Sequence, residues 1–174
     1  MIVLVLGGTR SGKSAVAEAI ASRLAGPGGA VTYVATARVD PADADHVARV
    51  DAHRARRPDT WTTVECADPG ALPGALVRAP GCVLLDSLGT WVSGHPGLDP
   101  DPAALVAALR ARSAPTVVVG EEVGLSLHAP TELGRRFVDA LGAVNRAVSD
   151  VADEALLVVA GRALRLPPPG DLPC

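Results

Sequence analysis

The sequence predicts an α/β domain built in three layers around a mainly parallel sheet. Short apolar, β-branched runs alternate with longer amphipathic segments along the chain, which is the pattern of this fold class. The chain has 174 residues, of which 48% are hydrophobic and 2% aromatic. We therefore expect one domain with an aliphatic core over residues 1–166. The tail PPPGDLPC (167–174) suits neither a strand nor a helix, and it is expected to be disordered.

Strands are expected where short apolar runs lie between turn signals. These runs span residues 2–6, 31–35, 82–86, 116–120 and 155–160, with a short one near 62–65 and a last one over 163–166. The last two runs in the chain would form a hairpin whose turn passes through Gly161 and Arg162.

The longer segments between these runs are expected to be helical. They span residues 13–25, about 42–56, 69–78, 102–112 and 131–151. The first of them places Ala15, Val16, Ala19, Ile20 and Leu24 at helical spacing. GPGGA (26–30) and GHPGLDPDP (94–102) are rich in glycine and proline, so we expect loops there, and neither is long enough to link two domains.

Composition excludes several classes of protein. A formal charge of -3 and few aromatic residues argue against a general nucleic-acid binder. No apolar stretch approaches the ~20 residues of a membrane span, and the first residues lack the pattern of a signal peptide. Cys66, Cys82 and Cys174 include no CxxC pair, and Cys82 opens an apolar run, which predicts a buried core thiol. We expect a cytoplasmic protein in a reducing setting.

The segment GGTRSGKS (7–14) carries the strongest functional signal. It matches the phosphate-loop pattern G-x-x-x-x-G-K-[ST] and lies between a predicted buried strand and an amphipathic helix. Its glycines let backbone N–H groups point at phosphate oxygens, and the helix N-terminus adds a positive dipole end. Lys13 would reach the β- and γ-phosphates, and Ser14 would bind Mg²⁺. The predicted nucleotide-binding residues here are Gly7, Gly8, Thr9, Arg10, Ser11, Gly12, Lys13 and Ser14.

The run CVLLD (82–86) predicts the second half of such a site. It ends in Asp86, so a carboxylate would lie at the C-terminal end of a parallel strand, where open α/β sheets bind ligands. In phosphate-loop proteins this aspartate holds Mg²⁺ directly or through water. The two segments together predict Mg²⁺ with ATP or GTP as the bound species, and no prosthetic group.

The segment RVDAHRARRPDTW (49–61) indicates which reaction follows. It surrounds His53 with Arg49, Arg54, Arg56 and Arg57. One interpretation is a solvated basic helix end, and the other is a phosphate-binding site. In the second interpretation the arginines bind phosphates while His53 acts as acid, base or nucleophile. His46 lies seven residues earlier in the sequence and is expected to be a bystander.

Four blocks in the same order make the chain resemble a known family. They are GGTRSGKS (7–14), YVATAR (33–38) with ARVDAHRARRPDTWTTVE (48–65), VLLDSLGTWVS (83–93), and EVGLSLHAPTELGRRFVDALGAVNRAVSDVADEALLVVAGRALRL (122–166). The family is the bifunctional adenosylcobinamide kinase / adenosylcobinamide-phosphate guanylyltransferase of cobalamin biosynthesis. The chain departs from the family pattern at Gly120 and Glu121, which stand where the family usually has Ser and Asn.

The resemblance implies a two-step transferase on a RecA-like phosphate-loop fold. Such an enzyme phosphorylates adenosylcobinamide with a nucleoside triphosphate, and then transfers GMP from GTP through a guanylyl-histidine to give adenosylcobinamide-GDP. The histidine of the family's H-R-x-x-R-P-x-x-W block falls on His53, which is therefore the expected nucleophile. Lys13 of the phosphate loop is the other expected catalytic residue. Arg54 and Arg57 would neutralise the phosphates. The resemblance also implies a homotrimer with a corrinoid as substrate.

Four further positions are candidate nucleotide contacts. Thr36 and Arg38 follow the second predicted strand, Glu65 ends the histidine-arginine block, and Glu122 follows the strand TVVVG. Glu122 could equally be a solvated residue in a turn.

Two other functions stay open at this point. One is a phosphate-loop kinase for another small alcohol, in which His53 is structural and no covalent enzyme–GMP forms. The other is a regulatory module that binds GTP and transfers nothing. A guanylyltransferase that has lost its kinase half is a third possibility.

Overall fold

The structure of the chain is a computed structural model that describes residues 1–37, 42, 57–125, 129–168 and 170. Its centre is one sheet in the order β3-β2-β4-β5-β1-β6-β7. The strands are β1 (Ile2–Gly7), β2 (Val31–Ala35), β3 (Thr62–Glu65), β4 (Cys82–Asp86), β5 (Thr116–Glu121), β6 (Glu154–Val159) and β7 (Arg162–Leu166). All neighbouring pairs are parallel except the β6–β7 hairpin. The predicted mainly parallel sheet with a C-terminal hairpin is confirmed.

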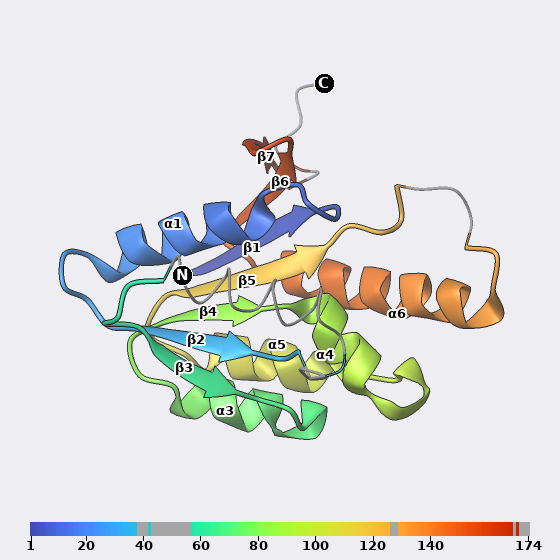
Figure 1. Cartoon of the computed structure of the whole chain (residues 1–174), viewed down its shortest axis with the longest axis horizontal. Coiled ribbons are helices and arrows are strands. Elements are labelled where there is room, and N and C mark those ends of the chain that lie inside the picture. Colours follow the sequence, from blue (N-terminus) through green and yellow to red (C-terminus); the bar gives the residue numbers. More distant parts are fainter. Residues whose placement is uncertain (38–41, 43–56, 126–128, 169, 171–174) are drawn as a thin grey trace.

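Helices cover both faces of this sheet, which makes the expected three layers (Figure 1). One face carries α1, and the other carries the remaining helices of the described part of the chain. The helices are α1 (Lys13–Ala25), α3 (Leu72–Arg78), α4 (Leu88–Gly94), α5 (Pro102–Arg110) and α6 (Glu132–Ser149), with short 3₁₀ turns η1 (Pro69–Ala71) and η2 (Pro96–Leu98). The expected helix over about 42–56 lies, apart from residue 42, outside the described residues.

Alternation of side chains along the strands divides the core into two clusters. The cluster under α1 contains Val3, Val5 and Cys82, and the opposite one contains Leu4, Leu85 and the indole of Trp91. Both are almost wholly aliphatic, and the burial of Cys82 confirms its predicted place in the core.

The inward face of α1 differs partly from the expected one. Ile20 is buried as predicted, but Ala17 and Ala21 complete the buried face while Ala15 and Ala19 are exposed. The helix begins at Lys13, directly after the left-handed turn at Gly12. The direction in which the chain leaves this turn points Ala17, Ile20 and Ala21 at the sheet.

Two local predictions are wrong. Helix α4 was not expected, because LGTWVSG combines two glycines with β-branched residues that favour other structures. It forms because Ser87 and Thr90 make a capping box and because its own side chains Trp91 and Val92 are buried in the core. The hairpin turn lies at Ala160 and Gly161, both with positive φ, and not at Gly161 and Arg162.

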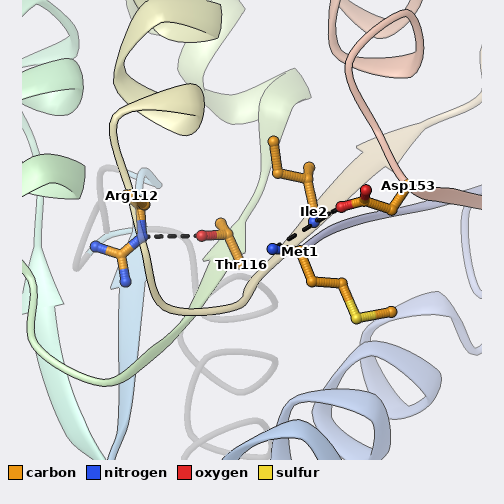
Figure 2. Close-up of polar contacts among 5 residues, drawn as sticks. All are labelled: Met1, Ile2, Arg112, Thr116 and Asp153. Atoms are coloured by element: carbon orange, nitrogen blue, oxygen red, sulfur yellow. Dashed lines mark hydrogen bonds and ion pairs between the residues drawn. The ribbon is translucent and has the colours of Figure 1, made fainter.

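The edge of the sheet where the parallel strands begin is held by polar contacts across distant segments (Figure 2). Asp153 accepts a hydrogen bond from the backbone N–H of Ile2 at 2.6 Å, and its carboxylate lies 3.9 Å from the N-terminal ammonium group of Met1. The Arg112 guanidinium donates to Thr116 Oγ1 at 2.8 Å and to backbone carbonyls of the loop before β4. These contacts tie the starts of β1 and β5 to distant segments of the chain.

Candidate active site

The C-terminal ends of the parallel strands meet at one edge of the sheet. The register pairs Gly7 of β1 with Glu121 of β5, and Ala35 of β2 with Asp86 of β4. The phosphate loop therefore follows a strand separated from Asp86 by β5 alone. This is the edge at which open α/β sheets bind ligands.

The phosphate loop folds back on itself over Gly8. The N–H of Ser11 donates to the Gly8 carbonyl at 3.2 Å, and Lys13 Nζ donates to the same oxygen at 3.3 Å. The ammonium group of Lys13 therefore lies against the backbone of the loop, where phosphate-loop proteins bind the β- and γ-phosphates. Thr9 and Arg10 are exposed on the loop, and Arg10 turns the chain with a φ of 58°.

Two glycines of the loop are required by close contacts. A Cβ at Gly7 would lie 2.5 Å from Ser11 Oγ and 2.8 Å from the Val158 carbonyl oxygen. Gly12 has a φ of +93°, and a Cβ there would lie 3.2 Å from the Cα of Gly161 in the hairpin turn. At Gly8 a Cβ would meet nothing within 4 Å. The turn of β6–β7 thus packs against the loop, and Gly161 N–H donates to the Ser11 carbonyl at 2.8 Å.

Asp86 ends β4 and is held by a residue that the sequence prediction missed. The hydroxyl of Tyr33, on β2, donates to Asp86 Oδ2 at 2.9 Å. Burial and the negative charge of Asp86 raise the pKa of Tyr33 far above its usual range, so the phenol stays protonated. The parallel register could have pointed to this pair, because Ala35 lies opposite Asp86 and Tyr33 is on the same face.

A second missed residue, Glu121, joins the end of β5 to the start of α4. Its carboxylate accepts from Ser87 Oγ at 2.6 Å and from Gly89 N–H at 2.7 Å. A Cβ at Gly89 would overlap this carboxylate. The departure from the family pattern at Glu121 therefore has a structural use, because it fixes the residue that follows Asp86.

Thr36 lies in this same polar cluster. Its hydroxyl is buried, donates to the Ser87 carbonyl at 2.7 Å and accepts from Ser87 N–H at 2.9 Å. The structure thus brings Thr36 to the predicted edge, where its visible role is to hold Ser87. Its contact with a nucleotide stays a prediction.

Three other predicted residues lie around this edge. Glu122 N–H donates to the Gly7 carbonyl at 3.1 Å, and Glu122 Oε1 accepts from Gly124 N–H at 2.8 Å, so its carboxylate caps a turn beside the phosphate loop. Glu65 is exposed at the end of β3. Arg57 lies with its guanidinium carbon 3.6 Å from the centroid of the Tyr33 ring. Arg38, His53 and Arg54 lie outside the described residues.

The oxygen groups at this edge fit Mg²⁺. The Ser14 hydroxyl and the Asp86 carboxylate are hard donors of the kind that Mg²⁺ prefers, and it completes its shell with phosphate oxygens and water. Within the described ranges no group of three or more His, Cys, Asp or Glu side chains could hold a metal by itself.

Comparison with known proteins identifies the family. The family model for cobinamide kinase / cobinamide phosphate guanyltransferase matches residues 3–166. The chain belongs to this family. The resemblance found in the sequence is confirmed.

Curated relatives match over nearly their whole length. The bifunctional adenosylcobalamin biosynthesis protein CobP of Pseudomonas aeruginosa is 36% identical over 167 residues, which cover 91% of this chain and 92% of that protein. The bifunctional adenosylcobalamin biosynthesis protein CobU of Escherichia coli is 34% identical over 186 residues, covering 95% of this chain and 99% of the relative. The CobU protein of Salmonella typhimurium is 32% identical with the same coverage.

Solved structures confirm the predicted fold. A KaiC-like protein from Pyrococcus horikoshii superposes with a TM-score of 0.52 at 13% identity, covering 90% of this chain and 71% of that one. The flagellar accessory protein FlaH from Methanocaldococcus jannaschii gives a TM-score of 0.53 at 12% identity, covering 95% and 77%. These likenesses agree with a RecA-like phosphate-loop fold. In the described part of the chain, no helix has the length and apolar character to cross a membrane.

Proposed function

We propose that the chain catalyses two successive transfers to one corrinoid. It first phosphorylates the aminopropanol hydroxyl of adenosylcobinamide with ATP or GTP, and it then transfers GMP from GTP to that phosphate to give adenosylcobinamide-GDP. The observation that carries the proposal is the family match over residues 3–166, together with a phosphate loop and Asp86 at one sheet edge. Neither a kinase for an unrelated alcohol nor a GTP-binding regulator accounts for that match.

In the kinase step, the phosphate loop binds the β- and γ-phosphates of the nucleotide. Backbone N–H groups of the loop and the N-terminus of α1 face these phosphates, and Lys13 neutralises the charge that develops on the transferred group. Ser14 and Asp86 would hold Mg²⁺, which polarises the phosphates when bound. The corrinoid hydroxyl attacks the γ-phosphorus, the bond to the bridging oxygen breaks, and the nucleoside diphosphate leaves.

In the guanylyl step, His53 is the proposed nucleophile. A neutral imidazole nitrogen forms a bond to the α-phosphorus of GTP while the bond to the pyrophosphate oxygen breaks. Arg54 and Arg57 would neutralise the pyrophosphate that leaves. A phosphate oxygen of adenosylcobinamide phosphate then attacks the same phosphorus, the P–N bond breaks, and His53 is regenerated.

The remaining expectations complete the proposal. Thr36, Arg38, Glu65 and Glu122 stay candidate nucleotide contacts, and the working form of the enzyme is a cytoplasmic homotrimer. Residues 1–166 form the whole catalytic domain, and the tail over 167–174 takes no part in catalysis. Size-exclusion chromatography with light scattering tests the trimer, and a chain truncated after residue 166 tests the tail.

Labelling with GTP tests the covalent step. The protein is incubated with Mg²⁺ and GTP labelled at the α-phosphate, and we expect label on the protein that is acid-labile and base-stable, as a phosphoramidate is. His53→Ala should abolish the label, whereas His46→Ala is the matched control and should retain it. An unlabelled wild type, or full labelling of His53→Ala, would refute the assignment.

A further inference from the structure

Tyr33 contacts residues that belong to both proposed half-reactions. It lies on β2 in the cluster under α1, is 5% exposed, and is the only tyrosine in the chain. Its hydroxyl donates to Asp86, the carboxylate proposed for Mg²⁺, at 2.9 Å. The face of its ring carries the guanidinium of Arg57, whose carbon lies 3.6 Å from the ring centroid.

The hydroxyl of Tyr33 restrains the orientation of Asp86. A carboxylate at a strand end can rotate about its last bond, and a donor at 2.9 Å removes most of that freedom. Outer partners of this kind commonly orient metal-binding carboxylates and strengthen metal binding. A neutral phenol suits this place, since it orients the carboxylate without adding a positive charge that would repel Mg²⁺.

The ring of Tyr33 holds Arg57, the guanidinium proposed to neutralise the pyrophosphate. Arg57 is four positions from His53 in the sequence, and it also donates from Nη1 to Thr63 Oγ1 at 3.2 Å. Thr63 is the cross-strand partner of Tyr33 on β3. Arg57 is thus fixed over the β2–β3 pair by a cation–π contact and a hydrogen bond.

We propose that Tyr33 is a positioning residue shared by the two transfers. Its hydroxyl orients Asp86 for the Mg²⁺–nucleotide, and its ring anchors Arg57, the guanidinium proposed to neutralise the pyrophosphate that leaves. This inference rests on the proposed function, and it adds a residue to which neither the sequence motifs nor the phosphate loop assigns a role.

Three substitutions separate the two contacts. Tyr33→Phe removes the hydroxyl and keeps the ring, Arg57→Gln removes the cation, and Tyr33→Leu removes both contacts of Tyr33. We expect Tyr33→Phe to raise the Mg²⁺ concentration for half-maximal kinase activity about tenfold, with kcat at saturating Mg²⁺ within about twofold of wild type. We expect Arg57→Gln to slow labelling of the protein by GTP about tenfold and to leave the Mg²⁺ dependence unchanged. Tyr33→Leu should show both effects.

Charge removal by itself is controlled by Arg110→Gln, on the far helix layer at the exposed end of α5. This variant should behave as wild type in both assays. A purely structural role for Tyr33 predicts a different pattern, in which Tyr33→Phe lowers kcat of both reactions and leaves the Mg²⁺ half-saturation unchanged. That pattern would overturn the proposal.

A spectroscopic readout tests the Asp86 contact without turnover. Because Tyr33 is the only tyrosine, protein labelled with ¹³Cζ-tyrosine gives one resonance from this ring. We expect the resonance to shift in Asp86→Ala, and to shift in the wild type on addition of Mg²⁺ with a non-hydrolysable GTP analogue. No response to either change would refute the coupling. If the wild type takes no label from GTP, the proposed guanylyl transfer fails, while the NMR experiment still decides the link from Tyr33 to Asp86.

Discussion

Replacement of Glu121 by alanine removes the carboxylate that joins β5 to the start of α4. The Ser87 hydroxyl and the Gly89 N–H then lose acceptors that lie 2.6 and 2.7 Å away. A hydrogen bond to a charged group contributes about 1.5–3 kcal/mol. Glu121 is half-buried, so water replaces part of the loss, and we expect a decrease of about 3 kcal/mol in the free energy of unfolding.

Urea denaturation followed by circular dichroism measures this decrease, and thermal unfolding should show a Tm lower by about 9 °C for a chain of this size. Glu121→Gln is the matched variant. Its amide oxygen can accept from Gly89 and its amide nitrogen can donate to a rotated Ser87 hydroxyl, so we expect a loss of about 1 kcal/mol. The reasoning is refuted if Glu121→Ala is as stable as wild type, or if Glu121→Gln is as unstable as Glu121→Ala.

Three further predictions concern other parts of the molecule. Lys13→Arg should lower kinase kcat by about 100-fold or more and leave the fold intact, because a broad guanidinium cannot take the place of the slim ammonium group beside the Gly8 carbonyl. A kcat near that of the wild type would contradict this. Arg112→Met should lower the free energy of unfolding by about 2–4 kcal/mol, because it leaves backbone carbonyls before β4 without their donor. KM for GTP should stay unchanged, and a raised KM would show that this edge of the sheet is not separate from the nucleotide site. The pKa of Tyr33 is raised in the folded chain, so above pH ~10 the unfolded chain releases a proton that the folded chain retains. The free energy of unfolding therefore falls with rising pH by up to about 1.4 kcal/mol per pH unit. Absorbance at 295 nm should show no tyrosinate until the chain unfolds, and ionisation near pH 10 in the folded chain would contradict the buried Tyr33–Asp86 bond.

Features with a local signal were predictable from the sequence. The alternation of apolar runs and amphipathic segments predicted a parallel α/β sheet. The phosphate loop has a motif because its tight turn, packed against the β6–β7 hairpin, leaves no room for side chains at Gly7 and Gly12. Asp86 was found because its position at the end of an apolar run is itself local. The structure confirms the sheet and places Asp86 at the end of β4, while its role at Mg²⁺ stays a prediction.

Contacts between segments distant in the sequence were not predictable in this way. The partners of Glu121 are more than thirty positions away in the sequence, and the bond from Tyr33 to Asp86 spans 53 positions. Each depends on the order and register of the strands, which the pattern of apolar runs does not specify. Helix α4 was missed for a related reason, because tertiary burial of Trp91 outweighs the weak helix propensity of its glycines.

The central claim is that GMP passes through His53 on its way to the corrinoid. The direct measurement is a single-turnover chase, in which protein labelled from α-labelled GTP is freed of nucleotide and mixed with adenosylcobinamide phosphate. We predict that the label leaves the protein and appears in adenosylcobinamide-GDP at least as fast as steady-state turnover. Label that stays on the protein, or that is released only as GMP, would contradict the claim.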